Sequence, residues 1–265
     1  MLRVKTVLHS LPMVLGSCLG ILAFSWPLYL PDSDFFLLQP ESARILSLLI
    51  AAIAISILSL EISRGAMDAK SVAILGVLAA LIAALRLVGA GAIGVEPMWF
   101  LLILSSYVFG TRFGFSLGVL SMGVSALLTG GIGTWLPFQM MAAGWIGAIS
   151  GLAGLIFKRK FETVKLVIVG ALCSLLFGAL MDLQLWPWLT ATDTQLSFVA
   201  GVSVTENLSR FLLFHLATAL AWDIPRAVTT GALILLTANP ILNSLRRAKL
   251  RLNLTSHEME QKAFV

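Results

Sequence analysis

Long apolar runs, separated by short polar stretches, follow one another along most of the chain. They lie at about 8–30, 43–61, 70–88, 97–110, 113–129, 138–157, 163–181 and 224–245. Most have roughly the 20 residues that a helix needs to cross a bilayer, and the alternation typical of a membrane barrel does not occur. The run at 97–110 is shorter and would need thin surroundings or a partly irregular path. The pattern predicts an all-α, polytopic membrane protein with about eight spans.

Composition agrees with membrane spans and excludes an ordinary soluble domain. The chain of 265 residues is 58% hydrophobic and 12% charged, and its mean hydropathy is +0.96. Soluble domains carry roughly a quarter of their residues as charges. The first run, 8–30, is as long as a span and no small-x-small cleavage site follows it, so we expect a retained helix rather than a signal peptide.

The charged residues predict how the chain is oriented in the membrane. The net charge is +5, but the Lys and Arg residues cluster in short loops between apolar runs, so nucleic acid is not an expected partner. With the N-terminus in the cytoplasm, most of them fall on the cytoplasmic side, as the positive-inside rule requires. We therefore expect both termini to be cytoplasmic. The basic clusters Lys158–Lys165 and Arg246–Arg251 are either topology determinants or patches for lipid head groups or a cytoplasmic partner.

Familiar catalytic motifs do not occur in the sequence. It contains no His-Glu-x-x-His, no Gly-x-Ser-x-Gly and no Walker motif. Cys18 and Cys173 fall inside apolar runs, where packing is a commoner role than a disulfide or a metal site. We expect a protein that is not an enzyme, with no metal and no cofactor of its own.

Small residues recur at helical spacing in two neighbouring runs. The positions are Gly110, Gly114 and Gly118 in the first, and Gly144, Gly147, Gly151 and Gly154 in the second. In a membrane such stripes let two helices approach closely and gain van der Waals contact. They either pack helices of this chain together or dock the chain to another membrane protein.

Polar and aromatic residues gather at the span ends that the charge pattern assigns to the outside. Arg86 precedes a glycine-rich loop, 89–95, which is followed by Glu96 and Pro97, and Trp99 lies near the start of the next run. Irregular backbone at membrane depth is tolerated only where protein or a water-filled cavity covers it. Charges at this depth are functional-site hypotheses by default, although Arg86 could instead snorkel to the head groups.

A second and a third break in the apolar pattern lie on the same side. The second, 130–139, holds Trp135 and Gln139; tryptophan here is ordinarily an interfacial belt residue, whereas the amide just inside the span has no such explanation. The third surrounds Pro225, which can open the last helix. Three breaks that each supply an aromatic ring and a polar group indicate an outward-facing pocket for a small solute. The expected substrate-binding residues are Arg86, Glu96, Trp99, Trp135, Gln139, Trp222, Asp223 and Arg226.

These residues also resemble a family. The stretch from Lys70 to Arg247 is similar to the substrate-binding membrane subunit, the S component, of energy-coupling factor (ECF) vitamin transporters. The most specific part is Gly131-Ile132-Gly133-Thr134-Trp135-Leu136-Pro137-Phe138-Gln139-Met140, followed by Gly144-Trp145-Ile146-Gly147. The loop with Glu96-Pro97, the segment Gly110-Thr111-Arg112-Phe113-Gly114-Phe115 and the closing segment 214–227 match as well.

The resemblance implies an architecture and a set of partners. Residues 67–250 would form a six-helix core with the ligand at its outer surface, after two extra N-terminal transmembrane helices at 1–66 and before a polar cytoplasmic tail at 251–265. The segment 182–222 would suit a lid or a larger ligand. The expected ligand is a vitamin, with a cobalamin-like compound as the first guess. In the cytoplasmic membrane of a bacterium or similar cell, a membrane-embedded coupling subunit and two cytoplasmic ATPases would be the partners, and ATP would be used by those ATPases. The coupling subunit would dock on Ala69, Ala73, Ala80 and Ala84.

Two other classes of function remain open at this point. A membrane enzyme acting on a lipid or isoprenoid would need acids or histidines that converge inside the bilayer, and the sequence offers few. An assembly protein would use the glycine stripes for docking, but would not need the polar groups at the outer breaks.

Overall fold

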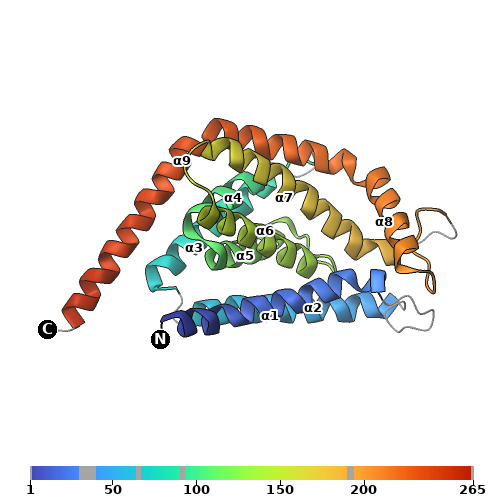
Figure 1. The fold of residues 1–265 in the computed structure, drawn as a ribbon, viewed down its shortest axis with the longest axis horizontal. Coiled ribbons are helices and arrows are strands. Elements are labelled where there is room, and N and C mark those ends of the chain that lie inside the picture. The colour runs from blue at the N-terminus through green and yellow to red at the C-terminus, as the bar shows by residue number, and fades with distance from the viewer. Residues whose placement is uncertain (1, 30–39, 64–66, 90–92, 190–193, 264–265) are drawn as a thin grey trace.

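The described part of the chain is entirely helical. This computed structural model describes residues 2–29, 40–63, 67–89, 93–189 and 194–263. The helices are α1 (Leu2–Tyr29), α2 (Pro40–Ser63), α3 (Ala69–Val88), α4 (Met98–Phe109), α5 (Thr111–Thr129), α6 (Leu136–Ile156), α7 (Glu162–Leu185), the 3-10 turn η2 (Trp186–Trp188), α8 (Val204–Thr218) and α9 (Leu220–Ala263). They form an elongated bundle with α1 and α2 along one side, α7 and α9 along the opposite side, and α3 to α6 between them (Figure 1).

The predicted membrane-protein class is confirmed. Seven of the described helices are long and apolar enough to cross a membrane. The short run at 97–110 forms α4, which has only 12 residues. The last predicted run lies within α9, which is 44 residues long and contains Pro240. The C-terminal part of α9 bends away from the bundle (Figure 1), and proline commonly bends a helix because it lacks the backbone N–H.

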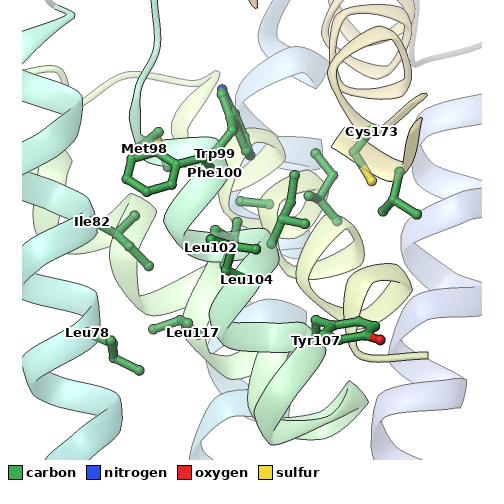
Figure 2. Packing of buried hydrophobic residues seen from close by; sticks show 14 of the residues in the cluster. Leu78, Ile82, Met98, Trp99, Phe100, Leu102, Leu104, Tyr107, Leu117 and Cys173 are labelled. Carbon is green, nitrogen blue, oxygen red and sulfur yellow. The ribbon is translucent and has the colours of Figure 1, made fainter. Parts of the chain in front are cut away.

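The short helix α4 lies in the centre of the bundle. Side chains all around it are buried, including Trp99, Leu102 and Leu104, while Leu78 and Ile82 of α3 point toward it (Figure 2). A helix that protein covers on all sides does not need to match the bilayer thickness. Thin surroundings are therefore unnecessary, and burial accounts for the short length of the run.

The connection from α4 to α5 is a single residue. Gly110 has φ +103°, a backbone conformation that L side chains rarely adopt. Its carbonyl accepts from the Gly114 amide and its own amide donates to the Ser106 carbonyl, so the chain turns sharply without leaving those groups unpaired. The turn holds α5 directly beside α4.

The glycine stripes pack α5 against α6. A Cβ added to Gly114 would lie 2.3 Å from the carbonyl oxygen of Gly147, and one added to Gly118 would lie 2.1 Å from that of Ala143. Real Cβ atoms do not approach so closely. Of the two readings of the stripes, packing within this chain is the one that these contacts support.

The two N-terminal helices pack against the rest of the bundle. Phe24 of α1 and Ile50 of α2 are buried in one cluster with Phe138 and Met141 of α6. At the other end of α2, the Glu61 carboxylate, 1% exposed, lies 2.6 Å from the Arg112 guanidinium of α5. Whether residues 1–66 are a separate unit from 67–250 stays a prediction, and its boundary lies next to 64–66, outside the described residues.

The break near Pro225 lies elsewhere than predicted. α8 ends at Thr218 and α9 begins at Leu220, so Pro225 lies inside α9. The backbone at Ala219 joins them, since its amide donates to the His215 carbonyl and its carbonyl accepts from the Trp222 and Asp223 amides. The chain therefore turns at Ala219, before Pro225.

Candidate functional site

Six helix ends meet at one end of the bundle, which we call the outer end because the charge pattern predicts it to face outward. They are the C-terminal ends of α3, α5 and α7 and the N-terminal ends of α4, α6 and α9. The loop before α4 is described from Ile93 onward; residues 90–92 of the predicted glycine-rich loop lie outside the described residues. The antiparallel course of these helices brings the three predicted breaks to the same side.

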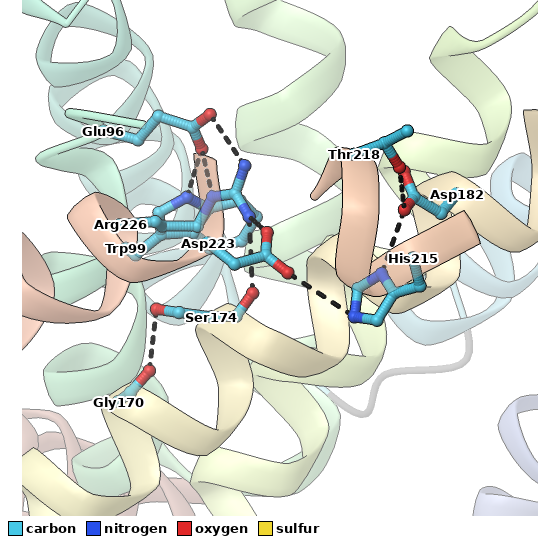
Figure 3. A network of polar contacts seen from close by, with 9 residues as sticks. All are labelled: Glu96, Trp99, Gly170, Ser174, Asp182, His215, Thr218, Asp223 and Arg226. Atoms are coloured by element: carbon cyan, nitrogen blue, oxygen red, sulfur yellow. Dashed lines mark hydrogen bonds and ion pairs between the residues drawn. The ribbon is translucent and has the colours of Figure 1, made fainter. Parts of the chain in front are cut away.

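Arg226 is the centre of a buried polar network at this end (Figure 3). Its guanidinium, 6% exposed, donates to both carboxylate oxygens of Glu96 at 3.2 and 3.3 Å and to Asp223 Oδ1 at 2.6 Å. It also donates to the Ser174 carbonyl at 3.3 Å, and Trp99 Nε1 donates to Glu96 Oε2 at 2.5 Å. Four of the predicted residues thus form one cluster in which every guanidinium nitrogen of Arg226 already has an acceptor.

His215 extends the network toward α7. Its Nδ1 lies 2.9 Å from Asp182 Oδ2, which also accepts from the Thr218 hydroxyl at 3.3 Å. Its Nε2 faces Asp223 Oδ2 at 3.8 Å, which is an ion-pair distance but not a hydrogen bond. His215 thus lies between two carboxylates, Asp182 and Asp223. In this geometry His215 is a polar residue with a hydrogen-bond partner inside the chain.

Two glycines make room for the network. An added Cβ at Gly178 on α7 would lie 2.0 Å from Asp223 Oδ1. Gly94 has φ +65°, and a Cβ there would lie 2.2 Å from the carbonyl oxygen of Trp222. The first glycine lets the Asp223 carboxylate lie against α7, and the second lets the loop that carries Glu96 approach the start of α9.

Arg86 belongs to a second cluster at the outer end. Its guanidinium donates to Ser125 Oγ of α5 at 2.7 Å and to Gln139 Oε1 of α6 at 3.1 Å. Both acceptors are neutral, and among the described residues no carboxylate lies within ion-pair distance of Arg86. The side chain is half-buried. The positive charge of Arg86 therefore has no ion-pair partner in this cluster, although Glu96 is near enough to interact with it electrostatically.

The two remaining predicted residues, Trp135 and Trp222, are the exposed ones. They are 45% and 48% exposed, and the ring of Trp135 covers Gly133, where an added Cβ would lie 2.4 Å from it. Neither indole forms a hydrogen bond with the described residues of the two polar clusters. Their positions are those expected both of interfacial belt residues and of a lining over the outer end.

A small cavity borders the His215 branch of the network. It has a volume of about 180 Å³ and is lined by Trp186, Leu196, Phe214 and Thr218, among others. Trp186, 1% exposed, donates from its indole nitrogen to the Leu196 carbonyl at 2.7 Å, which ties the segment after η2 to the bundle. The described residues contain no group of three or more His, Cys, Asp or Glu that could hold a metal ion.

The predicted docking residues share one face of α3. Ala69, Ala73, Ala80 and Ala84 are all exposed, and a Cβ added to Gly76 would meet nothing within 4 Å. The opposite face of α3 is buried through Leu75, Leu78, Ala79, Ile82 and Ala83. The exposed strip of α3 thus consists of these small side chains, next to the exposed side chains of Val77 and Leu81.

Sequence reasoning did not identify several residues of these clusters. Ser125 and Ser174 contribute a hydroxyl and a carbonyl, Asp182 binds His215, and Gly178 makes space for Asp223. Only Asp182 carried a usable signal, since an acid near the end of an apolar run is costly in a membrane. Serines and glycines are common in such helices, so their sequence positions alone do not distinguish them.

The fold and these clusters define a multi-pass helical membrane protein with charged groups assembled at one end of its helices. A family model described as "ECF transporter, substrate-specific component" matches residues 70–240. The chain belongs to this family, whose members are membrane subunits that bind a small molecule for transport with an ECF module and are not enzymes. No curated protein and no solved structure matches the chain.

Proposed function

We propose that this substrate-specific component captures its solute at the outer end and that Arg86 and Gln139 bind an anionic or strongly accepting group of the solute. The observation that carries this proposal is the unpaired charge of Arg86. A guanidinium at membrane depth is costly unless it is paired, and its present acceptors are a hydroxyl and an amide. A carboxylate or phosphate of a solute would supply the missing countercharge and could accept two parallel hydrogen bonds.

Arg226 is the less suitable anchor for a solute. All its nitrogens donate to Glu96, Asp223 or the Ser174 carbonyl, and binding a new acceptor would require at least one of these bonds to break. A solute acceptor that binds Arg86 would displace only neutral acceptors, the Ser125 hydroxyl and the Gln139 amide. In this proposal the Arg226 network holds the α3–α4 loop and α9 in place, and the Arg86 cluster contacts the solute.

The aromatic residues support a solute that also has an apolar or ring-shaped part. Trp135 is exposed beside the start of α6, the helix that carries Gln139. Small-molecule sites are mostly apolar with a few placed polar groups, which matches this pairing. A vitamin that bears an acidic group fits both features, and a cobalamin-like compound, the first expectation from the sequence, belongs in the same test panel.

Transport would require partners that dock on α3. We propose that the strip of Ala69, Ala73, Ala80 and Ala84 contacts a membrane-embedded coupling subunit, because small side chains permit close helix packing where lipid provides no hydrophobic drive. Two cytoplasmic ATPases would supply the energy from ATP. The proposal places the chain in the cytoplasmic membrane with both termini inside, as the charge pattern predicts.

The test is the thermal stability of the purified protein against a panel of vitamins, corrinoids and their neutral analogues. A ligand that binds only the folded state adds about 2.7 kcal/mol at a hundredfold excess over its dissociation constant. For a chain of this size that corresponds to a rise in Tm of about 5–10 °C. We expect a rise with at least one acidic compound and a smaller one with the analogue whose acid is esterified or amidated.

Variants then locate the site. Arg86→Gln should abolish the ligand-dependent rise. It should lower the unliganded Tm less than the loss of an ion pair would, because the acceptors it leaves, Ser125 and Gln139, are neutral. Arg44→Gln, which removes an exposed cation of α2, is the control and should keep the full rise. A full rise in Arg86→Gln, or equal binding of acid and amide, would contradict the proposal.

A further inference from the structure

A cavity lies at the opposite end of the bundle, which we call the inner end because the charge pattern predicts it to face the cytoplasm. It occupies the angle between the ends of α4, α6 and α7 and the C-terminal part of α9. Its volume is about 340 Å³, within the range of roughly 300 Å³ upward that small-molecule sites occupy. The lining residues that bear on its chemistry are Tyr107, Phe157, Arg159, Glu162, Arg246 and Lys249.

The lining carries an excess of positive charge. Among the described lining residues, three cations face the cavity and Glu162 is the one carboxylate. Glu162 is already engaged, since it pairs with Arg246 and accepts from the Tyr107 hydroxyl at 2.8 Å. The cavity thus has donors and cations left over and no free acid.

Two of the cations are available to a ligand. The Lys249 ammonium donates at 2.5 Å to the Val108 carbonyl, a neutral acceptor that leaves its charge uncompensated. Arg159 is exposed, and within the described part of the chain no hydrogen bond or ion pair joins its guanidinium to another residue. Arginine and lysine donors converging on one space, without a carboxylate of their own, match a phosphate group.

The surroundings of the cavity are apolar. Leu250 lines the cavity and is 61% exposed, and Leu155 and Ile156, which lie in the chain between the lining residues Gly154 and Phe157, are 77% and 66% exposed. Phe161, next to Glu162, is 69% exposed and adopts φ +57°, a left-handed conformation that is unfavourable for a bulky residue. These side chains lie where the membrane spans of α6 and α7 end, so a ligand phosphate in the cavity would have hydrocarbon directly beside it.

We infer that this cavity is a binding site for the phosphate head group of an anionic phospholipid, held by Arg159 and Lys249. Phosphate chemistry follows from the cations, and the lipid source follows from the apolar side chains at the membrane edge. The lipid would link the α6–α7 loop to α9, two segments far apart in sequence, and would thereby stabilise the inner end. This site is separate from the outer end and does not depend on the proposed solute.

A matched pair of double variants tests the site. Arg159→Gln with Lys249→Gln removes two cations from the cavity. Lys158→Gln with Arg247→Gln removes two cations from the same loop and the same helix, but neither lines the cavity. The two proteins have the same net charge, so general attraction to an anionic surface is equal in both.

The readout is Tm in nanodiscs of phosphatidylcholine alone and of phosphatidylcholine mixed with phosphatidylglycerol. We expect phosphatidylglycerol to raise the Tm of the wild type and of the control pair, and to leave that of the cavity pair unchanged. Wild type and both pairs should have similar Tm values in phosphatidylcholine alone, which shows that the cavity variant is folded. Should the double variant fail to fold, Arg159→Gln alone, at an exposed residue, must still reduce the rise.

Four outcomes would overturn the inference. The first is no rise in the Tm of the wild type with phosphatidylglycerol, and the second is an equal rise in Tm for both pairs. The third is an equal rise in Tm when inorganic phosphate is added to phosphatidylcholine discs. The fourth is a cavity pair that no longer co-purifies with the coupling module but keeps its full lipid-dependent rise in Tm. The second indicates non-specific surface attraction, the third a soluble phosphate, and the fourth a protein partner.

Discussion

Replacing Arg226 by glutamine should destabilise the protein far more than replacing any other cation at the outer end. The substitution removes the ion-pair partner of Asp223, a residue that is 1% exposed. It also removes two hydrogen bonds from Arg226 to Glu96. Among the described residues, the one remaining ion-pair contact of Asp223 would be to His215, 3.8 Å from its Oδ2. An uncompensated carboxylate in this position is the main cost.

The magnitude follows from measured losses of buried pairs. Removing one member of such a pair costs about 3–5 kcal/mol, because the other charge remains buried without compensation. With a shift of about 2–4 °C per kcal/mol for a chain of this size, Tm should fall by about 6–20 °C. Arg210→Gln is the matched control: Arg210 forms a more exposed pair with Glu206, four residues before it, so its loss should cost less than about 1 kcal/mol.

The assay is thermal unfolding of the purified proteins, followed by tryptophan fluorescence. The double variant Arg226→Gln with Asp223→Asn separates the charge effect from packing, because it removes the Asp223 charge together with that of its partner. We expect it to recover at least half of the lost Tm, as strongly coupled neighbours do. A Tm of Arg226→Gln within about 2 °C of the wild type would refute the reasoning. So would a double variant that is less stable than the wild type by the sum of the losses measured for Arg226→Gln and Asp223→Asn separately.

Two further predictions concern the faces of the bundle. Ala80→Leu should reduce co-purification of the coupling subunit about tenfold, or about 1.4 kcal/mol, because a bulky side chain on the exposed strip blocks close helix approach. Solute-dependent stabilisation should be retained. Unchanged co-purification would show that the coupling subunit docks elsewhere than on this face of α3. Glu61→Gln should lower the unfolding free energy by about 1–3 kcal/mol, since it removes a charge-assisted bond between α2 and Arg112. Glu41→Gln, at the exposed start of α2, is the control for thermal unfolding, and an equal effect of both would argue against the pair as an attachment of α2.

The predicted outer residues divide in the structure according to their partners. Glu96, Trp99, Asp223 and Arg226 were predicted to bind solute, and they bind one another. The sequence could not show this, since Arg226 and Glu96 are 130 residues apart. Whether any of them contacts solute stays a prediction, as do the cobalamin-like ligand and the lid at 182–222, of which residues 190–193 lie outside the described residues.

The glycine and alanine stripes looked alike in the sequence and differ in the fold. Gly114 and Gly147 allow α5 and α6 to touch backbone to backbone, whereas Ala80 and Ala84 face away from the bundle. Spacing alone places small residues on one side of a helix but does not say which neighbour that side meets. Only the packing of the bundle assigns one stripe to the interior and leaves the other available to a partner.

The sequence by itself determined that this protein is a helical membrane protein, where its spans lie, and which polar residues lie at the ends of those spans. Those properties are local, because hydropathy over about 20 residues decides whether a segment enters the bilayer. The tertiary structure decided which charges are paired, why a 12-residue helix suffices at the centre, and that Arg86 retains an unpaired charge. These depend on contacts between helices distant in the chain, where a difference of a few ångströms separates a buried ion pair from a free one.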